Sequence, residues 1–146
     1  MSYNPQNPNG QAAMASSAPV VIASNQTAVP AAASQETSAI YNGTSSLTPK
    51  FAVITASASG NTSVVALVAA KKIRVISYVV VTNATVNIKF QSNTTDKTGL
   101  LYLSANGGVS GAYAPTGHFE TASGEALNIN LSAAVAVGGH LTYVEV

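Results

Sequence analysis

The chain has 146 residues, of which 47% are hydrophobic and only 8% are charged, and its formal net charge is +1. This length suits one domain with its own core, and the weakly charged surface provides little repulsion between copies, which favours assembly. The six basic residues form no dense patch beyond residues 71–74, which excludes a nucleic-acid-binding protein.

Residues 1–49 differ in composition from the rest of the chain. Five of the six prolines lie here, and Glu36 is the only charged residue. Proline removes a backbone donor and keeps its predecessor extended, so an independent core is not expected. We interpret residues 1–49 as an extended N-terminal arm and residues 50–146 as the folded domain.

The predicted arm contains one short apolar run, Pro19-Val20-Val21-Ile22, followed by Ala23. Such a run can add as a strand to the exposed edge of another sheet. Ordering ten residues costs about 10–20 kcal/mol of backbone entropy, so the arm would hold one conformation only on a partner surface. We therefore assign Pro19, Val20, Val21 and Ile22 to partner contact. The alternative is a disordered tail.

The sequence after Pro49 has the pattern of strands. Residues 51–55 are the first predicted strand, residues 56–62 a turn of small residues with Gly60-Asn61, and residues 63–70 alternate weakly. Lys71-Lys72 marks an exposed bend before the central strand, residues 73–81.

The central strand, Ile73 to Val81, is the longest run of strand-favouring residues in the chain. A strict period of two places Ile73, Val75, Ser77, Val79 and Val81 on one face and Arg74, Ile76, Tyr78 and Val80 on the other. Because both faces are mostly apolar, we expect each to be covered, either by this chain or by a partner chain. A charge at Val79 is accordingly expected to abolish folding.

The second half of the chain continues with short strands. A tight reversal at 82–85 leads into a strand at 86–90, a polar loop at 92–98 and a short strand at 100–103. Residues 104–117 are glycine-rich and predicted to be irregular, and strands are expected at 118–120, 125–131 and 140–146. Gly138-Gly139 fits a two-residue hairpin turn. This succession predicts an all-β domain, a β-sandwich with jelly-roll topology preferred and immunoglobulin-like topology possible.

The sequence contains no convincing catalytic or metal-binding motif. His118 with Glu120, and His140 with Glu145, could contribute metal ligands, but no fixed ligand spacing supports a site. No GxSxG or phosphate-loop motif occurs, and the absence of cysteine excludes thiol chemistry. We predict no enzyme, no metal and no cofactor.

Membrane insertion is not expected either. No signal peptide is apparent, and the best candidate span, Val64–Val81, is interrupted by Lys71, Lys72 and Arg74. Exposed aromatic residues are the remaining candidates for binding. Tyr102 and Tyr113, with Tyr143 and Phe119, could stack on sugars, although such residues more often lie in a core or a subunit interface.

Two stretches carry a resemblance to known proteins. The segment from Pro19-Val20-Val21-Ile22 to Pro30 resembles one that recurs in small structural proteins of tailed-bacteriophage virions. Residues 71–75, 117–121 and 138–144 are similar to parts of small phage and prophage proteins. The resemblance implies a structural component of the virion and transfers no catalytic residues.

This resemblance implies a capsid decoration (cement) protein located on the capsid surface and assembled in the cytoplasm of the bacterial host. Its β-domain would form a homotrimer, and its arm would bind subunits of the major capsid protein. The alternative that it implies is a tail, baseplate or fibre component that contacts tail proteins or host-surface glycans.

Overall fold

The computed structural model describes residues 39–146. The predicted partner-contact residues Pro19, Val20, Val21 and Ile22 lie outside the described residues. Within residues 39–146 the structure contains strands and no helix, which confirms the predicted all-β fold. The strands are β1 (Ile40–Asn42), β2 (Ser45–Leu47), β3 (Lys50–Ala56), β4 (Gly60–Val65), β5 (Ile73–Thr82), β6 (Val86–Ser92), β7 (Thr95–Asp96), β8 (Leu101–Leu103), β9 (Gly108–Gly111), β10 (Phe119–Glu120), β11 (Leu127–Leu131) and β12 (Val137–Glu145).

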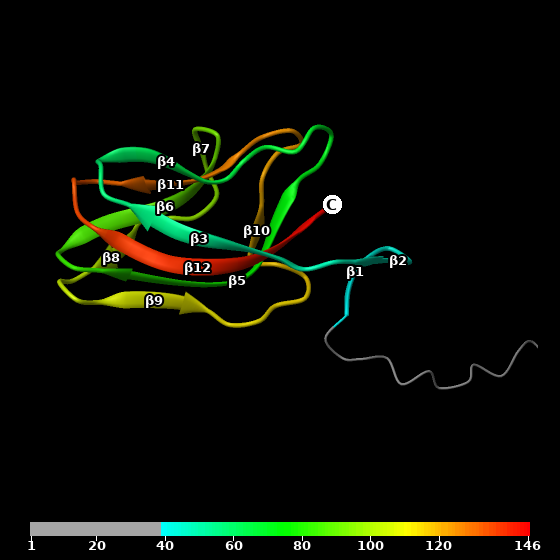
Figure 1. Cartoon of the computed structure of the whole chain (residues 1–146), viewed down its shortest axis with the longest axis horizontal. Helices are drawn as coiled ribbons and strands as arrows, with labels where there is room; N and C mark the ends of the chain where they lie inside the picture. The colour runs from blue at the N-terminus through cyan, green and yellow to red at the C-terminus, as the bar shows by residue number, and fades with distance from the viewer. Residues whose placement is uncertain (1–38) are drawn as a thin grey trace, which may run out of the picture. The chain divides into compact units, whose positions relative to one another are not determined.

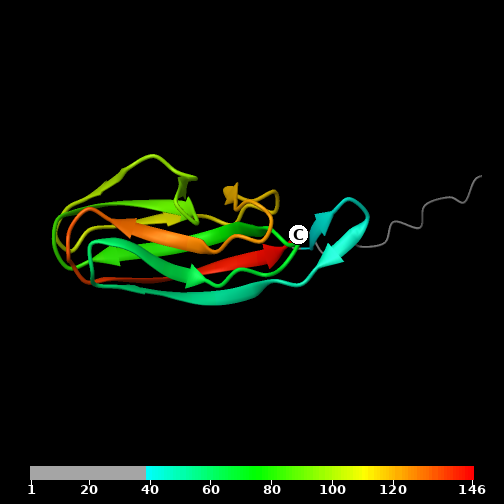
Figure 2. The same cartoon turned by 90° about the horizontal axis from the view of Figure 1, so that it is seen from above.

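Two antiparallel sheets form the body of the described residues. One has the order β10-β5-β12-β3, with β9 pairing farther along β5, and the other has the order β4-β11-β6-β7, with β8 pairing farther along β6. Figure 1 shows β4, β11 and β6 in one layer and β3, β12, β5 and β9 in the other. Seen from above, the strands of both layers run along the same long direction (Figure 2). The arrangement is β-sandwich-like, as the alternating patterns predicted.

The core lies between the two sheets. Every second residue of β6 and β11 points into it, because Ile88, Phe90, Leu127 and Ile129 alternate with polar residues along short strands. The Phe90 ring has no exposed area and meets the edge of Tyr78 at a centroid distance of 5.3 Å. Full burial of each such side chain contributes about 1.5–3 kcal/mol, so this shared core holds the two sheets together.

A β-bulge interrupts the central strand β5. Its pairing with β12 passes from Ser77 opposite Thr142 to Val75 opposite Tyr143, so Ile76 has no partner of its own. Val75 and Val80 consequently both belong to the core between the sheets, although a strict period of two would put them on opposite faces. The predicted assignment of faces along residues 73–81 is therefore wrong beyond Ile76.

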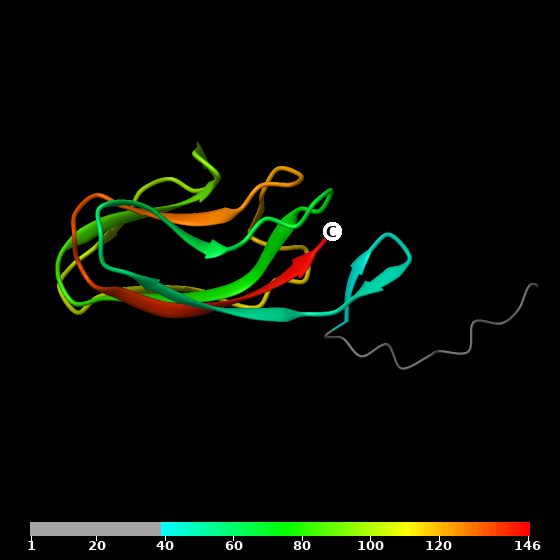
Figure 3. The same cartoon turned by 45° about the horizontal axis from the view of Figure 1, so that its top comes forward.

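The side chain of Ile76 is covered on the other side of the sheet by the hairpin β1–β2. Ile40, Ile76 and Val144 form a second cluster with exposed fractions of 1%, 0% and 0%, and Leu47 and Val146 pack against it. Figure 3 shows the hairpin beside the C-terminal end of β12. Residues 40–47, which the sequence analysis placed in the arm, thus supply part of the covering expected for the central strand.

Three local predictions differ from the structure. Gly138 and Gly139 lie inside β12 rather than in a hairpin turn, because β11 and β12 belong to different sheets and residues 132–136 connect them. Gly60 begins β4, so the preceding turn is shorter than predicted. Residues 108–111, expected to be irregular, form β9 against residues 78–81 of β5. Each of these outcomes depends on a strand that is distant in sequence.

Candidate functional site

The most distinctive surface of the described residues is the outward side of the sheet β3-β12-β5-β9, away from the core. We call it the outer face and define it by three rows of paired residues. The rows are Phe51–Thr142–Ser77, Val53–His140–Val79–Ser110 and Thr55–Gly138–Val81–Gly108. His140 is the only residue in these rows that can carry a charge, so the outer face is nearly neutral.

Large apolar side chains on the outer face are strongly exposed. Phe51 is 79% exposed, Val53 is 73% exposed and Val81 is 47% exposed. Phe51 and Val53 lie two positions apart on β3 and therefore on the same side of that strand. Because β3 is the edge strand of its sheet, these two side chains form an apolar ridge along the border of the outer face.

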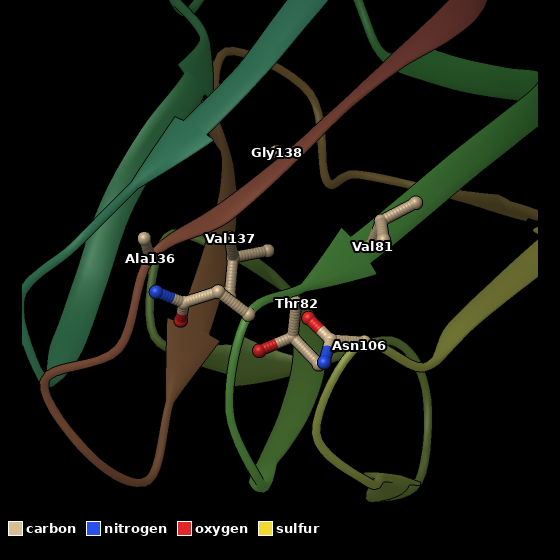
Figure 4. Close-up of a pocket in the computed structure, with 7 residues that line it drawn as sticks. Val81, Thr82, Asn106, Ala136, Val137 and Gly138 are labelled. Atoms are coloured by element: carbon tan, nitrogen blue, oxygen red, sulfur yellow. The ribbon is translucent and has the colours of Figure 1, made fainter.

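A shallow hollow lies at the other end of the outer face. It has a volume of about 430 Å³ and is lined by Val81, Thr82, Asn83, Asn106, Ala136, Val137 and Gly138. Figure 4 shows the side chains at the end of β5 and the start of β12, with Asn106 on the neighbouring loop. A second, smaller hollow of about 180 Å³ follows β5 and β9 and shares Val81. The absent side chain at Gly138 contributes to the larger hollow, because a Cβ atom there would have nothing within 4 Å.

Glycine has different roles at the two adjacent positions in β12. A Cβ atom added at Gly138 would meet nothing within 4 Å, so that position opens directly into free space. A Cβ atom added at Gly139 would collide with the Val79 carbonyl oxygen. Gly139 therefore permits the close approach of β12 and β5, whereas Gly138 leaves the hollow empty.

Charged pairs lie at the end of the sheet beyond the row of Phe51, outside the three rows of the outer face. Lys50 Nζ donates a hydrogen bond to Glu145 Oε1 at 2.6 Å, and this bond, more than the accompanying Coulomb attraction, raises the pKa of Lys50. Arg74 Nε is 2.5 Å from Glu120 Oε1, and Lys72 lies 3.7 Å from the same carboxylate. At this end of the sheet, each of the two carboxylates is therefore paired with at least one basic side chain.

The acids and histidines considered as metal ligands do not form a common site. Glu120 and Glu145 are paired with basic residues, as described above. His118 Nε2 lies 2.8 Å from the Ala112 carbonyl oxygen, and its ring meets the edge of Tyr78 at a centroid distance of 5.4 Å. His140 lies apart, on the outer face. Within residues 39–146 no group of three potential ligands could hold a metal ion.

The two candidate tyrosines lie on different parts of the domain, one in a strand and one in a loop. Tyr102 lies on β8 and is 75% exposed, while Tyr113 lies in the connection between β9 and β10 and is 49% exposed. Phe119 packs against the core and lies 5.1 Å from Phe90 by ring centroids, and Tyr143 also packs against the core. The four aromatic residues thus do not form one common platform.

The opposite sheet presents a polar outward side. Asn130 donates to Asn61, and Asn61 and Asn128 both donate to the Asn93 carbonyl oxygen. Nearby, hydrogen bonds from Gln91 and then from Lys89 lower the pKa of Asp96. Exposed apolar side chains occur outside the outer face as well, at Leu67, Leu100 and Tyr102, but Phe51, Val53 and Val81 share one side of one sheet.

Sequence reasoning did not identify Phe51 or Val53 as surface residues, and it assigned Gly138 to a hairpin turn. Residues 51–55 were recognised as a strand, but alternation alone does not show which side of an edge strand faces the core. The sequence does show that Phe51, Val53 and Thr55 are spaced two residues apart and therefore share one side of the strand. The hollow had no local signal, because its lining residues come from the end of β5, the start of β12 and the loop that contains Asn106.

No helix within residues 39–146 could cross a membrane. In comparisons with known proteins, neither a family model nor a curated protein matches the chain.

Proposed function

We propose that this chain is a non-enzymatic structural protein of a tailed-bacteriophage virion, and specifically a capsid decoration protein. Its β-domain would associate with copies of itself as a homotrimer, and its N-terminal arm would bind subunits of the major capsid protein on the capsid surface. The proposal rests on the resemblance of residues 19–30 and of parts of residues 71–144, together with the surface properties of the domain.

The observation that carries the proposal is the nearly neutral outer face with its exposed apolar side chains. Single exposed apolar residues are common on soluble proteins, but neighbouring ones on a flat sheet mark an interaction surface. Phe51 and Val53 are such neighbours, and Val81 lies on the same face. A component that is assembled into a larger structure has a use for such a surface, since assembly removes it from water.

The fold that we propose for this domain is a jelly roll. A jelly roll has two four-stranded antiparallel sheets, and in each of them a strand from early in the domain sequence pairs with a strand from late in it. The orders β3-β12-β5 and β4-β11-β6 follow this rule. The fourth strand of each sheet is divided into two short pieces, β9 and β10 beside β5 in one sheet and β8 and β7 beside β6 in the other. This strand order supports the jelly-roll assignment over the immunoglobulin-like one.

The proposed function is tested by binding the full chain to capsids that lack it. The full chain is expected to co-sediment with the capsids to a saturating level, and a chain beginning at residue 39 is expected to lose that binding because it lacks residues 19–22. A variant with Val20, Val21 and Ile22 replaced by serine is the matched control for length. Full binding by the shortened chain would contradict the role of the arm.

A tail, baseplate or fibre component is the second candidate, and the 75% exposed Tyr102 on β8 favours it. An exposed aromatic ring can stack on a sugar of a host-surface glycan, with the arm then anchored to tail proteins. Glycan-array binding by the full chain that is lost in Tyr102→Ala would support this candidate. Capsid binding without any glycan binding would support the decoration protein instead.

A further inference from the structure

We propose that the outer face binds a second copy of this chain, with the ridge formed by Phe51 and Val53 on one copy seated in the hollow around Gly138 and Val81 of the other. The inference rests on the self-association in the proposed function and names the surface that carries it. It concerns contacts between folded domains and does not involve residues 1–38.

The first argument comes from the incomplete covering of the central strand. Its apolar outward positions are covered by the chain itself only at one end, where Ile40 buries Ile76. At the other end, Val79 is half-buried and Val81 is 47% exposed, with no strand of residues 39–146 lying over them. A partner chain would continue the same covering along the strand.

The second argument is one of shape. The row of Phe51 and the row of Gly138 are four positions apart along β12, which is roughly 13 Å at about 3.3 Å per residue. The ridge is also one to two strand spacings from the hollow, at about 4.8 Å each. Phe51 cannot reach the hollow of its own chain, so only another molecule can bring the ridge and the hollow together.

The third argument is electrostatic. A contact between identical molecules fails if like charges meet, and the three rows of the outer face contain no lysine, arginine or acidic residue. The ion pairs of Lys50 with Glu145 and of Arg74 with Glu120 lie outside these rows and are internally compensated. A strongly charged partner would find no complementary group here, whereas a second neutral outer face fits.

The size of the face determines how strong the contact should be. Three strands of about seven residues and the four-residue β9, at about 4.8 Å between strands and about 3.3 Å per residue, give a face of roughly 400 Å² per copy. Stable interfaces bury about 800 Å² per partner, so the isolated molecules should associate in a concentration-dependent manner. Arms bound to one surface would hold neighbouring copies at a high effective concentration and so complete the contact.

The test is the molar mass of the full chain, measured by sedimentation velocity over a concentration series. The mass of the natural chain is expected to rise above that of one chain as concentration increases. Phe51→Ser, which removes the ridge, and Gly138→Val, which fills the hollow, should each keep the protein monomeric over the same series. Tyr102→Ser is the matched control, because it removes an equally exposed aromatic ring from the other sheet and should not change the association.

Gly138→Val separates loss of the contact from loss of folding. The added side chain meets nothing within 4 Å of its Cβ atom and valine favours strands, so its melting temperature should equal or exceed that of the natural chain. Association of this variant as tight as that of the natural chain, or a monomeric natural chain at every concentration, would overturn the inference. Capsid binding by such a monomer would leave the role of the arm intact.

A charge exchange provides an independent check. Phe51→Glu and Val81→Lys should each weaken association, because each puts an unpaired charge into an apolar contact. An equimolar mixture of the two variants should associate more tightly than either alone, since the intact ridge of Val81→Lys can bind the intact hollow of Phe51→Glu, and the introduced carboxylate can meet the introduced ammonium in the opposite orientation. A mixture that behaves as the sum of its separate components would contradict the pairing of ridge and hollow.

Discussion

At the scale of single residues, adjacent glycines in β12 have different consequences for stability. Gly139 lies where a Cβ atom would collide with the Val79 carbonyl oxygen, whereas the Cβ direction of Gly138 is open. We expect Gly139→Ala to lower the free energy of unfolding by about 1–3 kcal/mol through overpacking. Gly138→Ala should leave it unchanged or raise it by about 0.5–1 kcal/mol, because glycine is unfavourable inside a strand. Urea denaturation of the two variants measures the difference, and equal destabilisation would contradict it.

The expected effect of a charge at Val79 depends on which side of the sheet this residue faces. The sequence pattern made a charge at Val79 incompatible with folding. In the structure Val79 is half-buried, and it belongs to the outer face rather than to the core that contains Val80. A charge there would lie in the contact that we propose between copies, so its main expected effect moves from folding to association.

At the scale of elements, the hairpin β1–β2 is part of the stable body because it buries Ile40. Removing a fully buried isoleucine side chain typically costs about 2–5 kcal/mol, so Ile40→Ala should destabilise the domain by about 2–4 kcal/mol. The adjacent Tyr41 is 43% exposed, and Tyr41→Ala should change stability by less than about 0.5 kcal/mol. Thermal or urea unfolding compares the two. If Ile40→Ala is as stable as the natural chain, the second cluster does not contribute to the fold.

The bulge in β5 explains why one strand serves two clusters. Alternation from Val75 turns Ile76 toward Ile40 and Val144, and the bulge then returns Val80 to the same side as Val75, in the main core. The same element therefore anchors the hairpin on one part of the outer side and leaves Val79 and Val81 accessible on the other.

At the scale of the whole molecule, the hairpin determines where the N-terminal segment can be removed without damage. A chain beginning at residue 39 keeps the cover of Ile76 and should have the melting temperature of the full chain. A chain beginning at residue 50 loses the burial of Ile40 and Leu47, each worth about 1.5–3 kcal/mol for full burial, and should melt at a clearly lower temperature. Calorimetry of the three chains tests this, and equal melting temperatures for the two shortened chains would refute it.

Local sequence was sufficient to predict strands at β3, β5, β6, β8 and β11. Runs such as residues 73–81 and 86–90 combine β-branched residues with alternation, and both properties act within a few residues. The same composition showed that the domain would contain strands rather than helices. It also indicated that the central strand needs a cover on both sides, which the burial of Ile76 by Ile40 satisfies at one end.

Only the tertiary structure decided the strand partners, the bulge and the candidate surface. Gly138-Gly139 has the local chemistry of a turn, yet both residues are strand because β12 is held between β3 and β5. The exposed ridge at Phe51 and the hollow at Gly138 likewise depend on which face of the sheet meets the other sheet. The physical reason is that residue type sets local backbone preference, whereas pairing and burial are interactions between segments that lie far apart in the sequence.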